Sequence, residues 1–427
     1  MGSEMCIRDR VSTAGEAPIL DSLDFTLPPA STAVVDRRQH VRAYPTSAST
    51  LTPTGTRTCR IRLGGDDFID PNSVRLMYTI NETGGVANST LQPVAGPWGC
   101  FSQVYLRSNG VELDNIPQYG RFHQQYGFNQ LSMADQFGEA AITGMEGSWG
   151  NGSSNQPRMG TIAAGTSYTV MHRLYLSMFN QSKMLPTRYA PLELEVSVNP
   201  VTTDWLGTGT NSSQAFSISN IQLLYDAYAL DEAVQESMYK SLMASRVLSC
   251  PTLTIYQVVQ SIPGGSSSFS FSAVRAFSRL SHVWLTFRNT GPRSSEFISP
   301  TTVTNNAGPT PALSDGYAPS ARLSIGPHYW PDPAPAASIP ELFYQFQKCL
   351  PNVPNITRDN YLQNAFTIAF DVRKVPSDPT SSISTRSGDL LRVDLLNLSP
   401  NACTECWLTM FAFSVTCVRE SGVTLLT

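Results

Sequence analysis

The stretch "QSKMLPTRYAPLELEVSVNP", residues 181–200, decides the fold class of this chain. In its second half polar residues alternate with four apolar ones, Leu192, Leu194, Val196 and Val198. A period of two is typical of a strand that buries one face against a core. The turn before it, residues 183–186, contains no residue with obvious catalytic chemistry. The stretch therefore predicts a sheet element with a structural role.

Length and composition indicate a globular protein with more than one domain. The chain has 427 residues, more than one hydrophobic core usually supports. Hydrophobic residues make up 41 % of it, which excludes global disorder. Charged residues make up only 15 %, against roughly 25 % in ordinary soluble domains. This low charge indicates either a surface largely covered by other protein or a neutral, Ser/Thr/Asn-rich β protein.

The net charge of −4 argues against a dedicated nucleic-acid-binding protein, which is usually basic. A small basic cluster near the start has two interpretations, a contact to phosphate inside an assembly or an ordinary solvated strand end. Its members are Arg37, Arg38, His40 and Arg42. No apolar run reaches the roughly 18 residues that a membrane helix needs, and we expect neither a transmembrane segment nor a secretory signal.

Residues 1–10 are treated separately from the fold. They contain "MCIRDR", which looks like the translation of a sequencing adapter. We therefore exclude this segment from the domain assignment.

Strand patterns recur along the chain, whereas helix patterns are few. Asn109-Gly110 between two alternating runs is a strong hairpin signal. Part of 117–137 is expected to be helical, and Gly-, Ser- and Pro-rich stretches at 139–166 and 290–320 are expected to be long loops. The clearest helix has apolar residues at every fourth position, Leu230, Val234, Met238 and Leu242.

Strands, a loop, a short helix and more strands occur twice, the second short helix lying at 339–350. Many short antiparallel strands separated by turns predict sandwiches or barrels. The predicted fold class is all-β: two tandem eight-stranded jelly-roll β-sandwiches with short connecting helices. We assign residues 11–214 to the first jelly roll and 215–427 to the second, which is entered through a strand and connector helix at 215–245.

The sequence contains no recognisable motif for a catalytic, cofactor-binding or metal site. Its five histidines lack the H-x-H and H-E-x-x-H spacings of metal enzymes. Cys403 and Cys406 form a lone C-x-x-C with no second pair to complete a zinc site, and free thiols fit better. Asp66 and Asp67 are adjacent, so on a strand they face opposite ways rather than pair for glycoside hydrolysis.

Aromatic residues leave two alternatives open. Trp284, Trp330 and Trp407 are candidates for a sugar-binding platform, although tryptophans in strands belong more often to a core. His328 lies among aromatic residues in "GPHYWPD", where packing of the loop is favoured over stacking on a ligand.

Four stretches, in this order, resemble the double jelly-roll major capsid proteins of DNA viruses, a group that includes Polinton-like viruses, virophages and giant viruses. They are "TCRIRLGGDDFIDPNSVRLMYTIN" (58–81), "FSQVYLRSNGVELDNIPQYGRFHQQY" (101–126), "HRLYLSMFNQSKMLPTRYAPLELEVSV" (172–198) and "SGDLLRVDLL" (387–396). In those families the first jelly roll closes with an apolar strand, a Leu-Pro turn and an alternating strand. Residues 172–198 take that place here.

The resemblance covers nearly the whole chain from about residue 18. It implies a structural, non-enzymatic major capsid protein without a cofactor. It also implies homotrimers with a pseudo-hexagonal outline that tile an icosahedral virion, assembled inside the host cell. The implied partners are neighbouring capsomers and penton and minor capsid proteins, without sequence-specific nucleic-acid binding. The alternative is a carbohydrate-binding or carbohydrate-active β-sandwich protein, which needs a carboxylate pair and exposed aromatics in one cleft.

Overall fold

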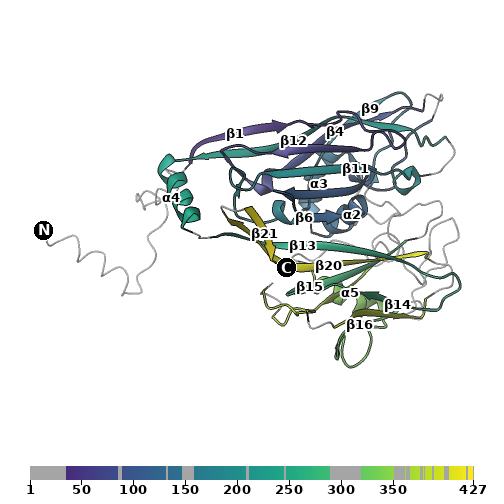
Figure 1. Cartoon of the computed structure of the whole chain (residues 1–427). Helices are drawn as coiled ribbons and strands as arrows, with labels where there is room; N and C mark the ends of the chain where they lie inside the picture. The colour runs from purple at the N-terminus through teal and green to yellow at the C-terminus, as the bar shows by residue number, and fades with distance from the viewer. Residues whose placement is uncertain are drawn as a thin grey trace, which may run out of the picture.

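The chain folds into stacked antiparallel sheets with helices between and beside them (Figure 1). The predicted adapter segment, and the predicted loop at 290–320 apart from its last two residues, lie outside the described part of this computed structural model. The structure describes residues 35–84, 89–130, 133–146, 158–207, 211–244, 247–288, 319–350, 361, 366–375, 378, 380–386, 389–398, 403–419 and 422–426.

The first half of the chain forms two facing sheets, named sheet I and sheet II. Sheet I has the order β1-β12-β4-β9, and the short strands β3 and β10 extend it beside β12. Its strands are β1 (Val35–Ala43), β3 (Phe68–Ile69), β4 (Arg75–Glu82), β9 (Ser167–Arg173), β10 (Leu185–Pro186) and β12 (Phe216–Leu230). Sheet II has the order β2-β11-β5-β6, with β2 (Thr58–Leu63), β5 (Phe101–Ser108), β6 (Val111–Ile116) and β11 (Leu192–Val198).

The second half forms sheets III and IV. Sheet III has the order β13-β20-β15-β18, with β21 paired to β20. It consists of β13 (Leu248–Ser261), β15 (Leu280–Arg288), β18 (Thr367–Asp371), β20 (Glu405–Arg419) and β21 (Gly422–Leu426). Sheet IV has the order β14-β19-β16-β17, with β14 (Ser268–Ala273), β16 (Ser320–Ile325), β17 (His328–Trp330) and β19 (Leu391–Leu396).

Helices and a small ribbon complete the described elements. The α-helices are α2 (Tyr119–Gln130), α3 (Met133–Thr143), α4 (Glu232–Met243) and α5 (Ile339–Lys348). Single 3-10 turns are η3 (Pro71–Ser73), η4 (Pro97–Cys100), η5 (Ser177–Phe179) and η6 (Thr202–Asp204). A two-stranded ribbon joins β7 (Met145–Glu146) to β8 (Arg158–Met159).

The two halves have the same topology. The eight main strands of the first half are, in chain order, β1, β2, β4, β5, β6, β9, β11 and β12, and those of the second half are β13 to β20. In each half the first, eighth, third and sixth of these strands form one sheet, in that order. The second, seventh, fourth and fifth form the other sheet. α2 and α5 both follow the fifth strand, β6 and β17 respectively. This arrangement of eight antiparallel strands is the jelly roll, so the predicted all-β fold class is confirmed.

The pairing of β12 bears on the predicted domain boundary. β12 pairs with β1, β3 and β4, which all belong to sheet I. The sequence assignment placed residues 215–245 with the second jelly roll, because local alternation does not reveal which distant strand is the partner. We therefore propose that the first jelly roll extends through β12, and that α4 is the connector between the two. The α4 helix begins after Asp231, whose side chain accepts a hydrogen bond from the Ala233 N–H.

The stretch at 181–200 folds as its pattern predicts. β11 lies inside sheet II, between β2 and β5, with its apolar residues buried. Its outward carboxylates lie among arginines, and Arg60 Nε is 2.9 Å from Glu195 Oε2. The hairpin at Asn109-Gly110 is also confirmed, since both residues have positive φ (49° and 82°), which the short turn between β5 and β6 requires.

Some elements were not predicted from the sequence. The expected loop at 139–166 includes the end of α3 and both strands of the small ribbon. β16 and β17 were also missed, because they follow a long Pro/Gly/Ala/Ser-rich stretch and β17 is only three residues long.

Truncating Leu194 tests the buried face of β11. Leu194 has no exposed surface in the centre of the first core, so we expect Leu194→Ala to lower the free energy of unfolding by about 2–5 kcal/mol. The control is Glu193→Ala on the outward face of the same strand, for which we expect a loss of at most about 1 kcal/mol. Urea unfolding of both variants measures this, and equal losses would contradict the assigned register.

Candidate functional site: the interface between the jelly rolls

The aromatic residues considered for a sugar platform do not form one. Trp284 and Trp407 are buried in sheet III, whereas Trp330 lies at the edge of sheet IV. The Trp284 ring packs between Tyr126 of α2 and Phe346 of α5, at centroid distances of 5.8 and 5.7 Å. The core interpretation therefore holds for Trp284 and Trp407.

Asp66 and Asp67 bind different partners. Asp66, with 83 % of its side chain exposed, lies 3.7 Å from Arg188, and Asp67 lies 3.8 Å from Arg37. Each carboxylate is thus compensated by its own arginine, an arrangement unlike the facing pair that glycoside hydrolysis needs.

The cysteines behave as buried thiols. All seven described cysteines are free and buried, and burial raises the pKa of Cys403 to about 12. In the part of the chain that the structure describes, no three His, Cys, Asp or Glu residues gather as metal ligands would.

The basic cluster lies on the exposed strand β1 and is partly neutralised. Arg38 and His40 both contact the carboxylate of Asp226 on the neighbouring strand β12. This contact lowers the pKa of Asp226, with the hydrogen bond from Arg38 as the main cause. The cluster therefore presents less net charge than its sequence implies.

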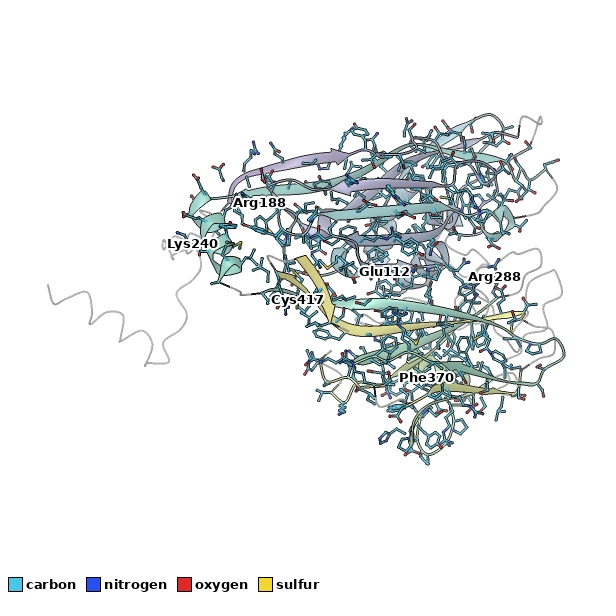
Figure 2. All side chains as sticks on the ribbon, in the orientation of Figure 1. Glu112, Arg188, Lys240, Arg288, Phe370 and Cys417 are labelled. Atoms are coloured by element: carbon cyan, nitrogen blue, oxygen red, sulfur yellow. The ribbon has the colours of Figure 1, made fainter. Side chains whose placement is uncertain are left out.

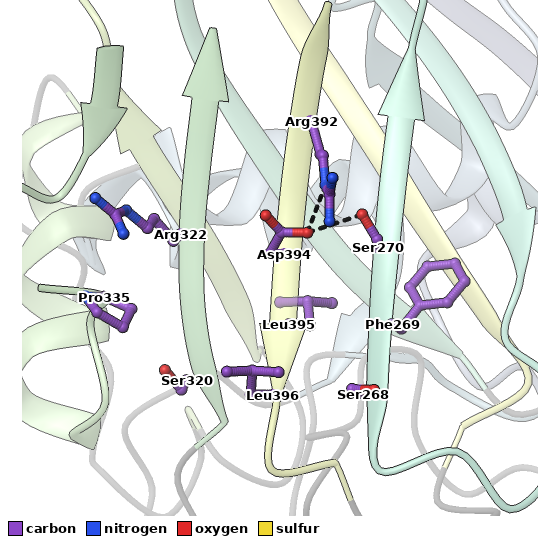
Figure 3. Close-up of a pocket in the computed structure, with 10 residues that line it drawn as sticks. All are labelled: Ser268, Phe269, Ser270, Ser320, Arg322, Pro335, Arg392, Asp394, Leu395 and Leu396. Atoms are coloured by element: carbon purple, nitrogen blue, oxygen red, sulfur yellow. Dashed lines mark hydrogen bonds and ion pairs between the residues drawn. The ribbon is translucent and has the colours of Figure 1, made fainter. Parts of the chain in front are cut away.

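A surface hollow of about 430 Å³ lies on the outer face of sheet IV (Figure 3). Arg392 Nε donates to Asp394 Oδ1 at 2.7 Å, and Ser270 Oγ donates to the same oxygen at 2.8 Å. The serine is thus a donor to a carboxylate that is already ion-paired. The hollow is lined by Ser268, Phe269, Ser270, Ser320, Arg322, Pro335, Arg392, Asp394, Leu395 and Leu396.

The most extensive constellation of side chains lies where α2 of the first jelly roll meets sheet III of the second. Phe122 and Tyr126 of α2 pack on Phe411, with ring centroids 6.3 and 5.8 Å away. The His282 ring stacks on Phe411 at 4.2 Å. Aromatic pairs at such distances stabilise by about 0.5–1.5 kcal/mol each beyond the burial of their area.

Polar groups of α2 are matched to sheet III as well. Arg121 donates from its guanidinium to the Phe287 carbonyl oxygen at 2.7 Å. Gln125 Nε2 donates to Thr367 Oγ1 at 3.2 Å. Arg121 also lies over the ring of Trp407, 5.8 Å from its centroid. These directed contacts specify one orientation of the two jelly rolls.

Ion pairs border the same interface. Arg288 at the end of β15 pairs with Asp204 of the first jelly roll and lies 3.7 Å from Glu405. Figure 2 shows Arg288 on the side of sheet III that faces the first jelly roll. Because Arg288 is almost completely buried, its pairing with Asp204 links the two halves where water is largely excluded.

Buried histidines flank the interface on both sides. His123 of α2 stacks on Trp98 at 4.0 Å and meets His172 of β9 edge-on at 5.1 Å. Burial lowers the pKa of His123 to about 3, since a charged imidazole is poorly solvated there. The pKa of His282 is lowered to about 3 for the same reason, with a smaller contribution from Arg373.

Asp114 of β6 is buried near the same interface. Its Oδ2 accepts hydrogen bonds from the Ser177 N–H at 2.7 Å and from Ser177 Oγ at 2.6 Å. Burial nevertheless raises its pKa to about 7, because desolvation outweighs these bonds. Both β6 and η5, which contains Ser177, contact β13 of sheet III.

This interface packs the first jelly roll against the second. Among its described residues no nucleophile, base and oxyanion donor are arranged as in an active site. Sequence reasoning did not identify it. The sequence signal for this interface is the spacing of apolar and amide residues within 119–126. That spacing can be interpreted only when the sheet facing the helix is known. No helix in the described ranges is long and apolar enough to cross a membrane.

No protein-family model and no curated protein sequence match the chain. Solved structures of viral particles and capsid proteins share its fold. A chain of the PBCV-1 virus capsid is 12 % identical with a TM-score of 0.64, covering 91 % of this chain and 96 % of that one. A chain of the Sputnik virophage structure is 8 % identical with a TM-score of 0.60, covering 96 % and 93 %. The Faustovirus major capsid protein is 8 % identical with a TM-score of 0.54, covering 97 % and 96 %.

The likeness spans nearly the full length of each chain. At these identities it shows the fold, which is therefore the double jelly roll of viral capsid proteins. The resemblance seen in the sequence is confirmed at this level.

Acidification tests the buried imidazole of His282. Because its pKa of about 3 in the folded protein lies below its ordinary value of 6.5, the unfolded chain binds the proton more tightly. Its contribution to stability is complete above pH 6.5 and is lost as the pH falls from 6.5 towards 3. His282→Phe keeps a ring on Phe411 but does not titrate. Between about pH 7 and pH 5, we expect the free energy of unfolding of the wild type to fall by about 2 kcal/mol more than that of the His282→Phe variant.

Urea unfolding at several pH values measures this difference. Asp114 titrates in the opposite direction, but equally in both proteins, so its contribution cancels in the comparison. Parallel pH profiles would show that His282 is not held neutral.

Proposed function

We propose that the protein is a major capsid protein that assembles as a homotrimer into pseudo-hexagonal capsomers of an icosahedral virion. The observation that carries this proposal is the exact repetition of one eight-stranded topology in two domains of a single chain. The full-length likeness to the PBCV-1 capsid and to the Faustovirus major capsid protein supports it.

The physical basis is the shape of the repeated unit. Two similar domains, joined where α2 of the first meets sheet III of the second, give each chain two units of the same construction (Figure 1). Three such chains in a closed ring present six similar domains, so the outline is nearly hexagonal although the symmetry is threefold. Hexagonal outlines tile a surface without gaps.

The distribution of chemical groups also favours a structural role. The histidines at 123, 172 and 282, and the buried guanidiniums of Arg121 and Arg288, contribute to packing within or between the two jelly rolls. The carbohydrate alternative required exposed aromatics beside a carboxylate pair. The burial of Trp284 and Trp407 and the separate pairing of Asp66 and Asp67 argue against it.

Neighbouring capsomers, penton and minor capsid proteins follow from the same proposal as partners. The assembled protein would then be located in the virion. Its proposed role is structural, through contacts with other proteins, and not catalytic.

The solution mass of the purified full-length chain tests self-assembly. Size exclusion with light scattering is expected to give three times the chain mass of 46.6 kDa, with hexagonal particles in negative stain. A monomer at every concentration tried, together with binding on a glycan array, would instead favour the carbohydrate alternative.

A further inference from the structure

Helix α2 lies between the first jelly roll and sheet III, and each jelly roll holds a different side of it (Figure 1). On one side Arg121 and Gln125 donate hydrogen bonds to sheet III. On the other side His123 Nε2 donates to the Arg173 carbonyl oxygen at 2.7 Å, and the His123 ring stacks on Trp98 at 4.0 Å. The junction between the jelly rolls therefore depends on how firmly the first of them holds α2.

On this inner side His123 meets a second buried histidine, His172 of β9. Their ring centroids lie 5.1 Å apart, with the rings nearly perpendicular. His172 has no exposed surface, and neither of its ring nitrogens has a hydrogen-bond partner among the described residues. The Nδ1 atom of His123 also lacks a partner there. Buried polar atoms are normally hydrogen-bonded, so these two residues, named the histidine pair, call for an explanation.

The surroundings of the histidine pair are aromatic. The ring centroids of Tyr78 and Phe101 lie 5.6 and 6.3 Å from that of His172, and that of Tyr175 lies 4.8 Å from that of His123. Such rings pack well on a neutral imidazole. They do not replace the hydration that a charged imidazole loses on burial.

The charged groups near the histidine pair oppose a proton on it. Burial lowers the pKa values of both histidines, that of His123 to about 3, and the positive charges of Arg75 and Arg173 lower them further. Glu139 of α3 lies 3.9 Å from Arg75 and pairs with it. Burial raises the pKa of each neighbouring phenol and thiol, which are therefore neutral: Tyr78, Tyr119, Tyr175 and Cys100.

We propose that the histidine pair is an acid-sensitive switch that releases α2 from the first jelly roll and thereby loosens the junction with sheet III. Protonation puts two positive charges 5.1 Å apart, measured between the ring centroids, where little water screens them. Because His123 belongs to α2 and His172 to β9, their repulsion acts across the contact that holds the helix. The switch goes beyond the proposed capsid function and does not depend on it, since both histidines belong to one chain.

Linkage gives the expected size of the effect. An imidazole that is neutral when packed and has its ordinary pKa of 6.5 when released favours the released state about 25-fold more at pH 5 than at pH 7. Two such imidazoles multiply to about 600-fold. Asp114 is not expected to contribute, because its hydrogen bonds to Ser177 join β6 to η5 and do not involve α2.

Hydrogen exchange of the full-length chain at pH 7 and pH 5, corrected for the intrinsic exchange rate, tests the release of α2. In the wild type we expect the protection of the α2 amides to fall by up to about 600-fold, and that of the β11 amides to fall much less. In His172→Phe, which keeps a ring but does not titrate, the fall should be about 25-fold smaller. The control His328→Phe, at an exposed position on β17, should behave as the wild type.

Two results would overturn the proposal. One is an α2 profile in His172→Phe that matches the wild type. The other is an equal loss in α2 and β11, because it would report unfolding of the whole jelly roll. If His172→Phe lacks protection already at pH 7, His172→Met takes its place, since an unbranched thioether adapts to an aromatic surrounding.

Small-angle X-ray scattering on the same samples tests the loosening of the junction, with the oligomeric state of each sample measured by light scattering. At equal oligomeric state, we expect the radius of gyration of the wild type to increase between pH 7 and pH 5, and that of His172→Phe to increase less. A wild type that releases α2 at constant radius of gyration would show that the junction does not depend on the histidine pair.

Discussion

The packing of α2 onto sheet III is the interaction on which the rest of the structure depends. A jelly roll is complete in itself, and two of them on one chain need not hold a fixed angle. Here the Tyr126 and Phe411 rings, the His282 stack and the buried Arg121 hydrogen bond make the angle part of the fold. In the proposed capsid role this rigidity is needed, because a small error in angle would be repeated at every neighbouring unit.

Burial at and near this interface shifts the pKa values of several ionisable side chains. Histidines 123 and 282 are neutral in the folded protein because burial lowers their pKa values, whereas Asp114 has a raised pKa for the same reason. Acid therefore acts on these groups in opposite directions, because protonation of the imidazoles destabilises the folded protein, whereas protonation of Asp114 stabilises it.

Repetition of one topology gives the chain two versions of each surface, and their chemistry has diverged. The outer face of sheet III is aromatic and covered, whereas that of sheet I carries Arg75 and Arg173 beside Met77 and Met171. The outer face of sheet II carries an arginine–glutamate network, whereas that of sheet IV holds a serine-lined hollow around Asp394. Covered and solvated faces are therefore distributed over one repeated framework.

Alternation in the sequence determined the strands, as Leu192–Val198 illustrates, because a half-buried strand must repeat every two residues. The hairpin at Asn109-Gly110 and the connector helix α4 were equally local and were predicted. Only the tertiary structure decided that β12 belongs to sheet I, and that the tryptophans at 284 and 407 lie on the face of sheet III that α2 contacts. Those properties depend on which distant strands pair and in what register, and no local pattern encodes the partner.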